Sequence, residues 1–172
     1  YMNAKGLPNP GIEAFGEEMH EASKDAVPII GSVFGSSAEE FAALAKRMQD
    51  YGAEAVELNL SCPHAKGYGM EMGVDPDVVA NIIKEVKAAV VVPVFAKLTP
   101  NTHRLIEVAK AAEDAGVDAI VAINTLKAMR IDVDARMPVL ANRYGGLSGP
   151  AVRGVGVRCV YELYEALKIP VI

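Results

Sequence analysis

The stretch Gly52-Ala-Glu-Ala-Val-Glu-Leu-Asn59 holds the pattern that decides the fold. A glycine able to end a helix precedes a short run of small and β-branched residues, which predicts a buried strand over residues 53–58. A polar amide stands where that strand ends. The stretch from Gly116 to Asn124 has the same order of glycine, apolar run and asparagine, with a spacing that differs by one residue. Both stretches predict the same unit, a strand with a polar side chain at its carboxyl end.

Segments of the same kind alternate with amphipathic helices along the rest of the chain. Apolar runs predict strands over residues 27–33, 53–58, 92–96 and 119–123, and residues 169–172 predict the first half of a fifth strand. Helices are predicted to begin at Asn9-Pro10, at the capping box Ser37-Ala-Glu-Glu40, at Asp75-Pro76 and near Leu105, and a last helix is predicted over residues 152–167.

Strands separated by helices imply parallel pairing through right-handed crossovers, which leaves a doubly wound sheet and a (β/α) barrel as candidates. The stretch Gly31-Ser-Val-Phe-Gly35 does not supply the G-x-G-x-x-G turn of a dinucleotide-binding sheet. Barrels instead carry functional side chains at the carboxyl ends of several strands. Such positions are occupied here by Ser32, Asn59, Lys97 and Asn124. We therefore predict an α/β fold, a (β/α)8 TIM barrel.

A complete barrel takes about 250 residues, so a chain of 172 residues would supply roughly two thirds of one. The chain starts in a predicted loop and stops in a predicted strand. We expect residues 1–172 to form a single partial barrel domain of about five βα units, truncated at both ends.

The composition excludes several other classes of protein. With 51% hydrophobic and 23% charged residues, the chain has ample material for a core, which excludes intrinsic disorder. A net charge of −5 without a basic cluster argues against a nucleic-acid partner. No apolar run approaches the roughly 20 residues of a membrane helix, and no secretory leader is visible. Two distant cysteines and three dispersed histidines predict neither disulfides nor a metal site, so we expect a reducing, cytoplasmic compartment.

The sharpest local feature is Asn59-Leu-Ser-Cys62-Pro-His64, which follows a predicted strand end. An amide can offer both a donor and an acceptor to a ring amide or imide. Cys62 can serve as a nucleophile or proton acceptor if its pKa falls below about 8.5, and the alternative is a small buried hydrophobe. His64 beside it is a base, a ligand or a bystander. Cys159 lies among apolar helical residues and is predicted to be core.

Two further features suit an anionic ligand. Lys97 ends an otherwise apolar strand, where it suits an anionic substrate, a phosphate or a cofactor that becomes anionic; a rim lysine is the alternative. The run Gly145-Gly-Leu-Ser-Gly149-Pro precedes the last helix, and its backbone N–H groups can bind phosphate. The alternative for this run is a turn that simply starts a helix.

Five motifs occur in order with sensible spacing and together resemble the class 1 dihydroorotate dehydrogenase family, FMN enzymes of pyrimidine biosynthesis. The motifs are Asn3-x-x-Gly6-Leu7-x-Asn9-Pro10-Gly11, Asn59-Leu-Ser-Cys-Pro63, Pro93-Val-Phe-Ala-Lys97-Leu, Ile123-Asn-Thr125 and Gly145-Gly-Leu-Ser-Gly-Pro-Ala151. Cysteine in the second motif is typical of class 1. The last motif is most similar to the NAD-linked type, which implies a second subunit with FAD and an iron–sulfur cluster, and the family also implies a homodimer.

The resemblance implies a role for individual residues. Cys62 would be the base that removes a proton from the carbon next to a dihydroorotate carbonyl, and the adjacent carbon would give hydride to the flavin. The substrate, dihydroorotate or orotate, would be held by Asn3, Gly6, Leu7, Asn59, Asn124 and Thr125. The FMN would be lined by Ser32, Asn59, Ile123 and Gly149, with Lys97 facing its pyrimidine edge.

The chain also departs from the family pattern. His64 stands where the family usually has asparagine, Arg153-Gly154 replaces a more usual Lys-Pro, and Ala128 replaces a common glycine. The early strands and the late glycine loops of the family are absent, so we expect the isolated fragment to be inactive. Three alternatives remain: a dihydropyrimidine dehydrogenase-type flavin domain, a phosphate-binding barrel aldolase or isomerase with Lys97 as Schiff base, and a non-catalytic half-barrel that self-associates.

Overall fold

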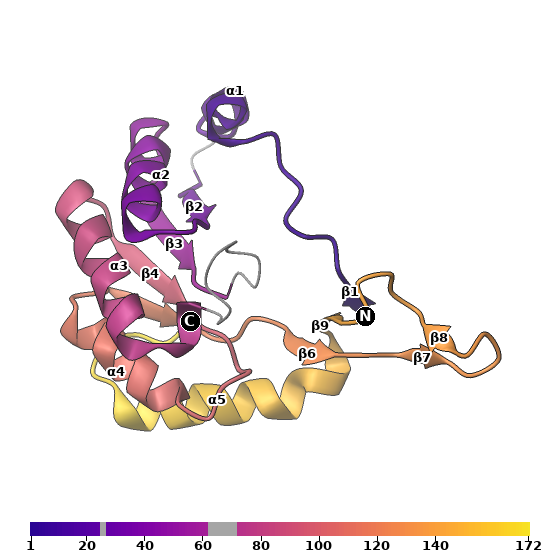
Figure 1. Ribbon diagram of the computed structural model, residues 1–172. Helices are drawn as coiled ribbons and strands as arrows, with labels where there is room; N and C mark the ends of the chain where they lie inside the picture. The colour runs from indigo at the N-terminus through magenta and orange to yellow at the C-terminus, as the bar shows by residue number, and fades with distance from the viewer. Residues whose placement is uncertain (25–26, 62–71) are drawn as a thin grey trace.

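Four parallel strands form the centre of the computed structural model, which describes residues 1–24, 27–61 and 72–172 (Figure 1). They are β2 (Ile30–Val33), β3 (Ala55–Asn59), β4 (Val94–Lys97) and β5 (Ala119–Val121), and they pair in that order. A parallel bridge between Ile120 and Val171 adds the beginning of a further strand beyond β5. Four of the five predicted strands are therefore present, each shorter than its apolar run, and the fifth is represented by the bridge at Val171.

The helices lie on one face of this sheet. The main ones are α1 (Ile12–Ala22), α2 (Ala38–Asp50), α3 (Pro76–Ala89), α4 (Leu105–Asp114) and α5 (Arg153–Ala166). In Figure 1, α2, α3 and α4 stand side by side, and α5 runs beside α4. A strand order that follows chain order, with right-handed crossovers, puts successive helices on the same face, whereas a doubly wound sheet reverses its order and covers both faces. The fold is thus part of a (β/α)8 barrel, as predicted.

Short elements complete the chain. They are the 3-10 turns η1 (Met72–Val74) and η2 (Pro150–Val152) and the strands β1 (Met2–Asn3), β6 (Leu126–Ala128), β7 (Ile131–Asp132), β8 (Met137–Pro138) and β9 (Gly145–Leu147). Within the described ranges, every helix is too short or too polar to cross a bilayer.

The core lies between the sheet and the helices. Side chains alternate along a strand, so each strand presents one set to the helices and the other to the opposite face. In β3, Val56 and Leu58 are fully buried on the helix side, while Glu57 and Asn59 are only partly buried on the other side. The sheet therefore has a dry outer face and a polar inner face, which becomes the interior of the barrel.

The helix starts follow the predicted caps with two differences. Ser37 caps α2, since its side chain accepts from the Glu40 N–H at 3.2 Å. In a capping box the Glu40 carboxylate would accept from the Ser37 N–H, but here it accepts from the backbone N–H and the hydroxyl of Ser36. These two hydrogen bonds from Ser36 lower the pKa of the Glu40 carboxyl.

The predicted start of the first helix is wrong by two residues. Helix α1 begins at Ile12 behind Gly11, whose φ of 87° is a conformation that favours glycine. The Asn9 side chain does not cap the helix; it accepts from the Gly11 N–H at 2.9 Å and so closes a turn in front of it.

The first half of the glycine-rich run before α5, Gly145–Leu147, is a strand and not part of a turn that simply starts the helix. Strand β9 lies between β1 and β6 in a small antiparallel sheet, which we call the lid sheet (Figure 1). Glycine is required because a Cβ at Gly145 would collide with the Asn3 carbonyl oxygen, and one at Gly146 would lie 2.9 Å from the Thr125 Cβ. The lid sheet joins the N-terminal segment to the loop that follows β5.

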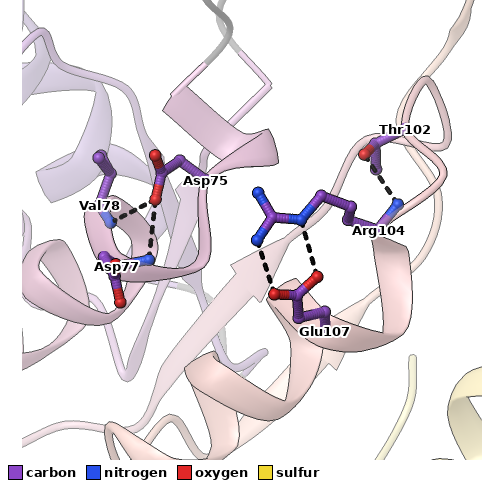
Figure 2. Close-up of polar contacts among 6 residues, drawn as sticks. All are labelled: Asp75, Asp77, Val78, Thr102, Arg104 and Glu107. Carbon is purple, nitrogen blue, oxygen red and sulfur yellow. Dashed lines mark hydrogen bonds and ion pairs between the residues drawn. The ribbon is translucent and has the colours of Figure 1, made fainter.

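Asp75 provides a test of how these caps contribute to stability. Its carboxylate accepts from the backbone N–H groups of Asp77 and Val78 at 2.9 and 3.3 Å at the start of α3 (Figure 2). We expect Asp75→Ala to lower the free energy of unfolding of the full-length protein by about 1 kcal/mol, measured by urea denaturation. Asp75→Asn keeps the acceptor and should cost clearly less; equal losses in the two variants would contradict the capping role.

Candidate functional site

A cavity of about 670 Å³ opens where the carboxyl ends of the strands meet the lid sheet. Its walls come from the N-terminal segment, from the ends of β3 and β5, from the loop after β4 and from β9. The residues that line it are Asn3, Ala4, Lys5, Gly6, Leu7, Pro8, Asn59, Ser61, Thr99, Asn101, Asn124, Thr125, Lys127, Asn142, Tyr144, Gly145 and Gly146. All six residues predicted to hold a substrate are among them, although they are scattered from position 3 to position 125.

The lining has a distinct chemical character. Five asparagines and two lysines, Lys5 and Lys127, contribute to it, and no carboxylate does within the described part of the chain. Asparagine offers paired donors and acceptors, and lysine offers positive charge with three donors. This set suits a small anion that also carries amide or imide edges.

Two asparagines at the carboxyl ends of β3 and β5, which are separated by β4, are joined at the cavity wall. The Asn124 Nδ2 donates to Asn59 Oδ1 at 3.0 Å, and Asn124 Oδ1 accepts from the Thr125 N–H at 2.8 Å. Asn59 Oδ1 also accepts from the Ser61 N–H at 3.3 Å. Because its oxygen already has two protein donors, Asn59 has its NH2 group to offer to a ligand.

The loop after β4 contributes a second network, which the sequence did not reveal. Thr99, only 1% exposed, accepts at Oγ1 from the Nδ2 group of Asn101 at 3.0 Å. Asn101 also donates to the Thr125 carbonyl at 3.0 Å and accepts from the Lys127 N–H at 2.8 Å. Asn101 therefore fixes the segment that carries Thr125. The polar residues Thr99 and Asn101, which follow the predicted strand over residues 92–96, were the sequence signal for this network.

Two features of the wall point toward a ligand. The Ser61 hydroxyl is buried and has no hydrogen-bond partner among the described residues. Leu7 has a φ of 56°, a left-handed conformation that disfavours a side chain and costs on the order of 1–3 kcal/mol. An orphaned hydroxyl and a strained backbone residue both line the same cavity.

The residues predicted to line a flavin are placed differently. Ser32 and Lys97 lie on the inner face of the sheet, outside the cavity wall, and both contact Glu57. The Ser32 Oγ donates to Glu57 Oε1 at 2.8 Å, and Lys97 Nζ lies 3.6 Å from the same oxygen. Glu57 was not among the predicted site residues; its position two residues before Asn59, on the same side of β3, was the available signal.

The other predicted positions are more dispersed. Ile123 packs against the core between β5 and Asn124, and Gly149 stands at the start of η2 with a φ of 96°. Cys159 is buried in the core, as predicted, and burial raises the pKa of its thiol, which disfavours the reactive thiolate. Cys62 and His64 lie outside the described residues.

Comparison with known families gives a match over the whole chain. A family model described as "Dihydroorotate dehydrogenase" matches residues 1–172. A protein of Thermoplasma acidophilum named "Dihydroorotate dehydrogenase B (NAD(+)), catalytic subunit" is 61% identical over 94% of this chain and 53% of its own length. Proteins of the same name from Methanocella arvoryzae and Methanocaldococcus jannaschii are 56% and 51% identical, cover all of this chain, and are matched over 56% and 57% of their own length. The chain thus spans about half the length of these relatives.

Solved structures show the fold alone. The carboxyl transferase domain of Rhizobium etli pyruvate carboxylase with 3-hydroxypyruvate superposes with a TM-score of 0.54 at 15% identity, covering 66% of this chain and 19% of that one. Phosphonopyruvate hydrolase gives a TM-score of 0.50 at 22% identity over 66% of this chain and 42% of that one. Both likenesses concern the arrangement of strands and helices.

The close packing of β9 predicts an effect of adding one methyl group. We expect Gly146→Ala to lower the free energy of unfolding by about 1–3 kcal/mol, because the new Cβ would press against Thr125. Gly154→Ala is the matched control, since its Cβ would meet nothing within 4 Å in α5, and alanine there should be neutral or stabilising. Urea denaturation of the full-length variants measures both. Similar effects at the two positions would refute the packing argument.

Proposed function

The chain belongs to the dihydroorotate dehydrogenase family, and from that premise we propose that the protein of which it forms part oxidises dihydroorotate to orotate in pyrimidine biosynthesis. The cavity is the observation that carries this proposal. Orotate is a small ring with a carboxylate and an imide edge, and the cavity combines five asparagines with two lysines and, among the described residues, no carboxylate.

The substrate would be oriented by groups at the strand ends and in the N-terminal segment. The NH2 groups of Asn59 and Asn124 would donate to oxygen atoms of the ring or carboxylate, because the oxygens of both amides already accept protein N–H groups. Asn3 would act from the opposite wall, with Gly6, Leu7 and Thr125 shaping the space between. The positive charge of Lys5 and Lys127 favours an anion at this place.

Proton transfer would fall to Cys62. Its neighbour Ser61 lines the cavity, and a thiolate there would take the proton from the carbon next to a ring carbonyl while hydride leaves the adjacent carbon. A polar pocket that holds the ring by its edges fixes which carbon meets the base.

The hydride acceptor would be FMN. Membership of the family supports a flavin, and a bound flavin supplies the two-electron acceptor that the reaction requires. The groups on the inner face fit it, because Lys97 and the Asn59 amide offer N–H donors and the oxygen of Ser32, whose hydrogen is donated to Glu57, offers an acceptor to a pyrimidine edge. Ile123 and Gly149 would add to its surroundings.

The ion pair of Lys97 bears on the aldolase alternative. Schiff-base formation needs a lysine amine that can reach a bound carbonyl carbon, whereas Lys97 lies on the inner face of the sheet, 3.6 Å from Glu57 Oε1, and does not line the cavity. The structure therefore gives no support to that alternative. A dihydropyrimidine dehydrogenase-type domain would use a similar ring pocket and is separated from our proposal by the substrate that reduces the flavin.

We further propose a partner subunit and a homodimer. The relatives are named catalytic subunits of an NAD⁺-linked enzyme, which supports a second subunit that passes electrons onward, with FAD and an iron–sulfur cluster as its expected carriers. A cytoplasmic location stays a prediction.

A visible spectrum of the full-length protein tests the proposed reaction. We expect flavin absorption bands that bleach on anaerobic addition of dihydroorotate, and in Cys62→Ala the same bands should bleach at least about 100-fold more slowly. Bands that respond to uracil-type substrates and not to dihydroorotate would favour the alternative flavin domain. Absence of flavin would contradict the proposal.

The asparagine pair predicts a change in ligand affinity. Asn124→Ala removes a ligand donor and the 3.0 Å bond that orients Asn59, so the Kd for orotate should rise about 10- to 100-fold. Asn81→Ala, on the exposed surface of α3, is the matched control and should leave the Kd unchanged. Titration of the flavin spectrum with orotate measures both constants. Unchanged affinity in Asn124→Ala would place the ligand elsewhere.

A further inference from the structure

One carboxylate on the inner face of the sheet has no part in the reaction described above. Glu57 lies in the middle of β3, and its side chain is only 16% exposed. A carboxylate is seldom placed in a mostly buried position without a partner. Its partners come from both neighbouring strands, Ser32 from β2 and Lys97 from β4.

The strand register explains why these three side chains meet. Ser32 lies directly opposite Glu57 in the β2–β3 pair, and Lys97 lies opposite Asn59 in the β3–β4 pair. Positions 57 and 59 point to the same side of β3, so Lys97 is the diagonal neighbour of Glu57 on the inner face. The strand register therefore brings Ser32, Glu57 and Lys97 together on the inner face.

The two contacts share one oxygen atom. Glu57 Oε1 accepts from the Ser32 hydroxyl at 2.8 Å and lies 3.6 Å from Lys97 Nζ. The hydroxyl holds the carboxylate in place from the side of β2. At 3.6 Å the ammonium is close enough for ion pairing but farther than the 2.7–2.9 Å typical of a charged hydrogen bond, so its N–H donors stay available to a ligand.

We propose that Glu57 is a positioning residue that orients Lys97 toward the flavin and offsets part of its positive charge, which lowers the reduction potential of the bound flavin. This inference rests on the proposed function, in which Lys97 faces the flavin. A reduced flavin carries negative charge at its pyrimidine edge, so a nearby cation favours reduction and a nearby carboxylate opposes it. Both side chains are mostly withdrawn from solvent, with exposures of 30% and 16%, which limits screening of this effect.

The reduction potential of full-length, FMN-loaded protein tests the inference. We expect Glu57→Gln to shift the midpoint potential to a more positive value, because the amide can keep the Ser32 contact while it removes the negative charge. Glu54→Gln is the matched control: Glu54 is exposed just before β3, and its loss of the same charge should leave the potential unchanged. Anaerobic spectroelectrochemical titration measures all three proteins.

The outcomes separate this inference from the proposed function. If the wild-type flavin is bleached by dihydroorotate but Glu57→Gln and Glu54→Gln have the same potential, the inference is wrong and the proposed function stands. If the wild-type protein binds no flavin, both fail. If Glu57→Gln does not give soluble protein, Glu57→Ala removes the same charge beside the open inner face, and the same positive shift is expected. A purely structural role for Glu57 would change thermal stability and leave the potential unaltered.

Discussion

The alternation of side chains along β3 is the constraint on which the rest of the structure depends. Val56 and Leu58 are fully buried against the helices. Because side chains alternate along a strand, their burial fixes Glu57 and Asn59 on the opposite face. A shift of the β3 register by one residue would bury the Glu57 carboxylate and the Asn59 amide between the sheet and the helices. Burying these polar groups without hydrogen-bond partners would raise the free energy of the folded state by several kcal/mol. Burial of the outer face therefore determines which polar groups reach the inside of the barrel.

The lid sheet adds a further wall to the cavity at the carboxyl ends of the strands. Strand β9 lies between the N-terminal strand β1 and strand β6 of the loop after β5, and Gly145 and Gly146 allow the close approach to Asn3 and Thr125. The cavity thus takes one wall from the first residues of the chain and another from residues more than a hundred positions later. Glycine serves here to let backbones approach closely.

The sequence predicted those features that depend on local pattern. Four strands and the beginning of a fifth, the helices between them and the caps at Ser37 and Asp75 follow from periodicity and from side chains that act on nearby N–H groups. The six substrate positions came from a family resemblance, and the structure gathers them around one cavity. One failure depends on tertiary contact, since Gly145–Leu147 became a strand that packs against Asn3 and Thr125. The other is local, because the Asn9 side chain accepts from the Gly11 N–H in front of the helix and Gly11 takes the cap position. Glu57 escaped notice because a single charge in an apolar strand gives no sign of its cross-strand partners.

The two parts of the candidate site differ in electrostatic character, and this difference would serve the proposed redox reaction. The cavity presents cations and amides without an opposing carboxylate among its described lining residues, which favours an anionic ring. On the inner face, the cation Lys97 is balanced by Glu57. A site that held only cations would bind the anion well but would also make the flavin hard to reoxidise. Because the carboxylate of Glu57 stands on the sheet and not in the cavity wall, the same barrel mouth would, in the proposed reaction, attract an anionic substrate and still allow the reduced flavin to pass its electrons on.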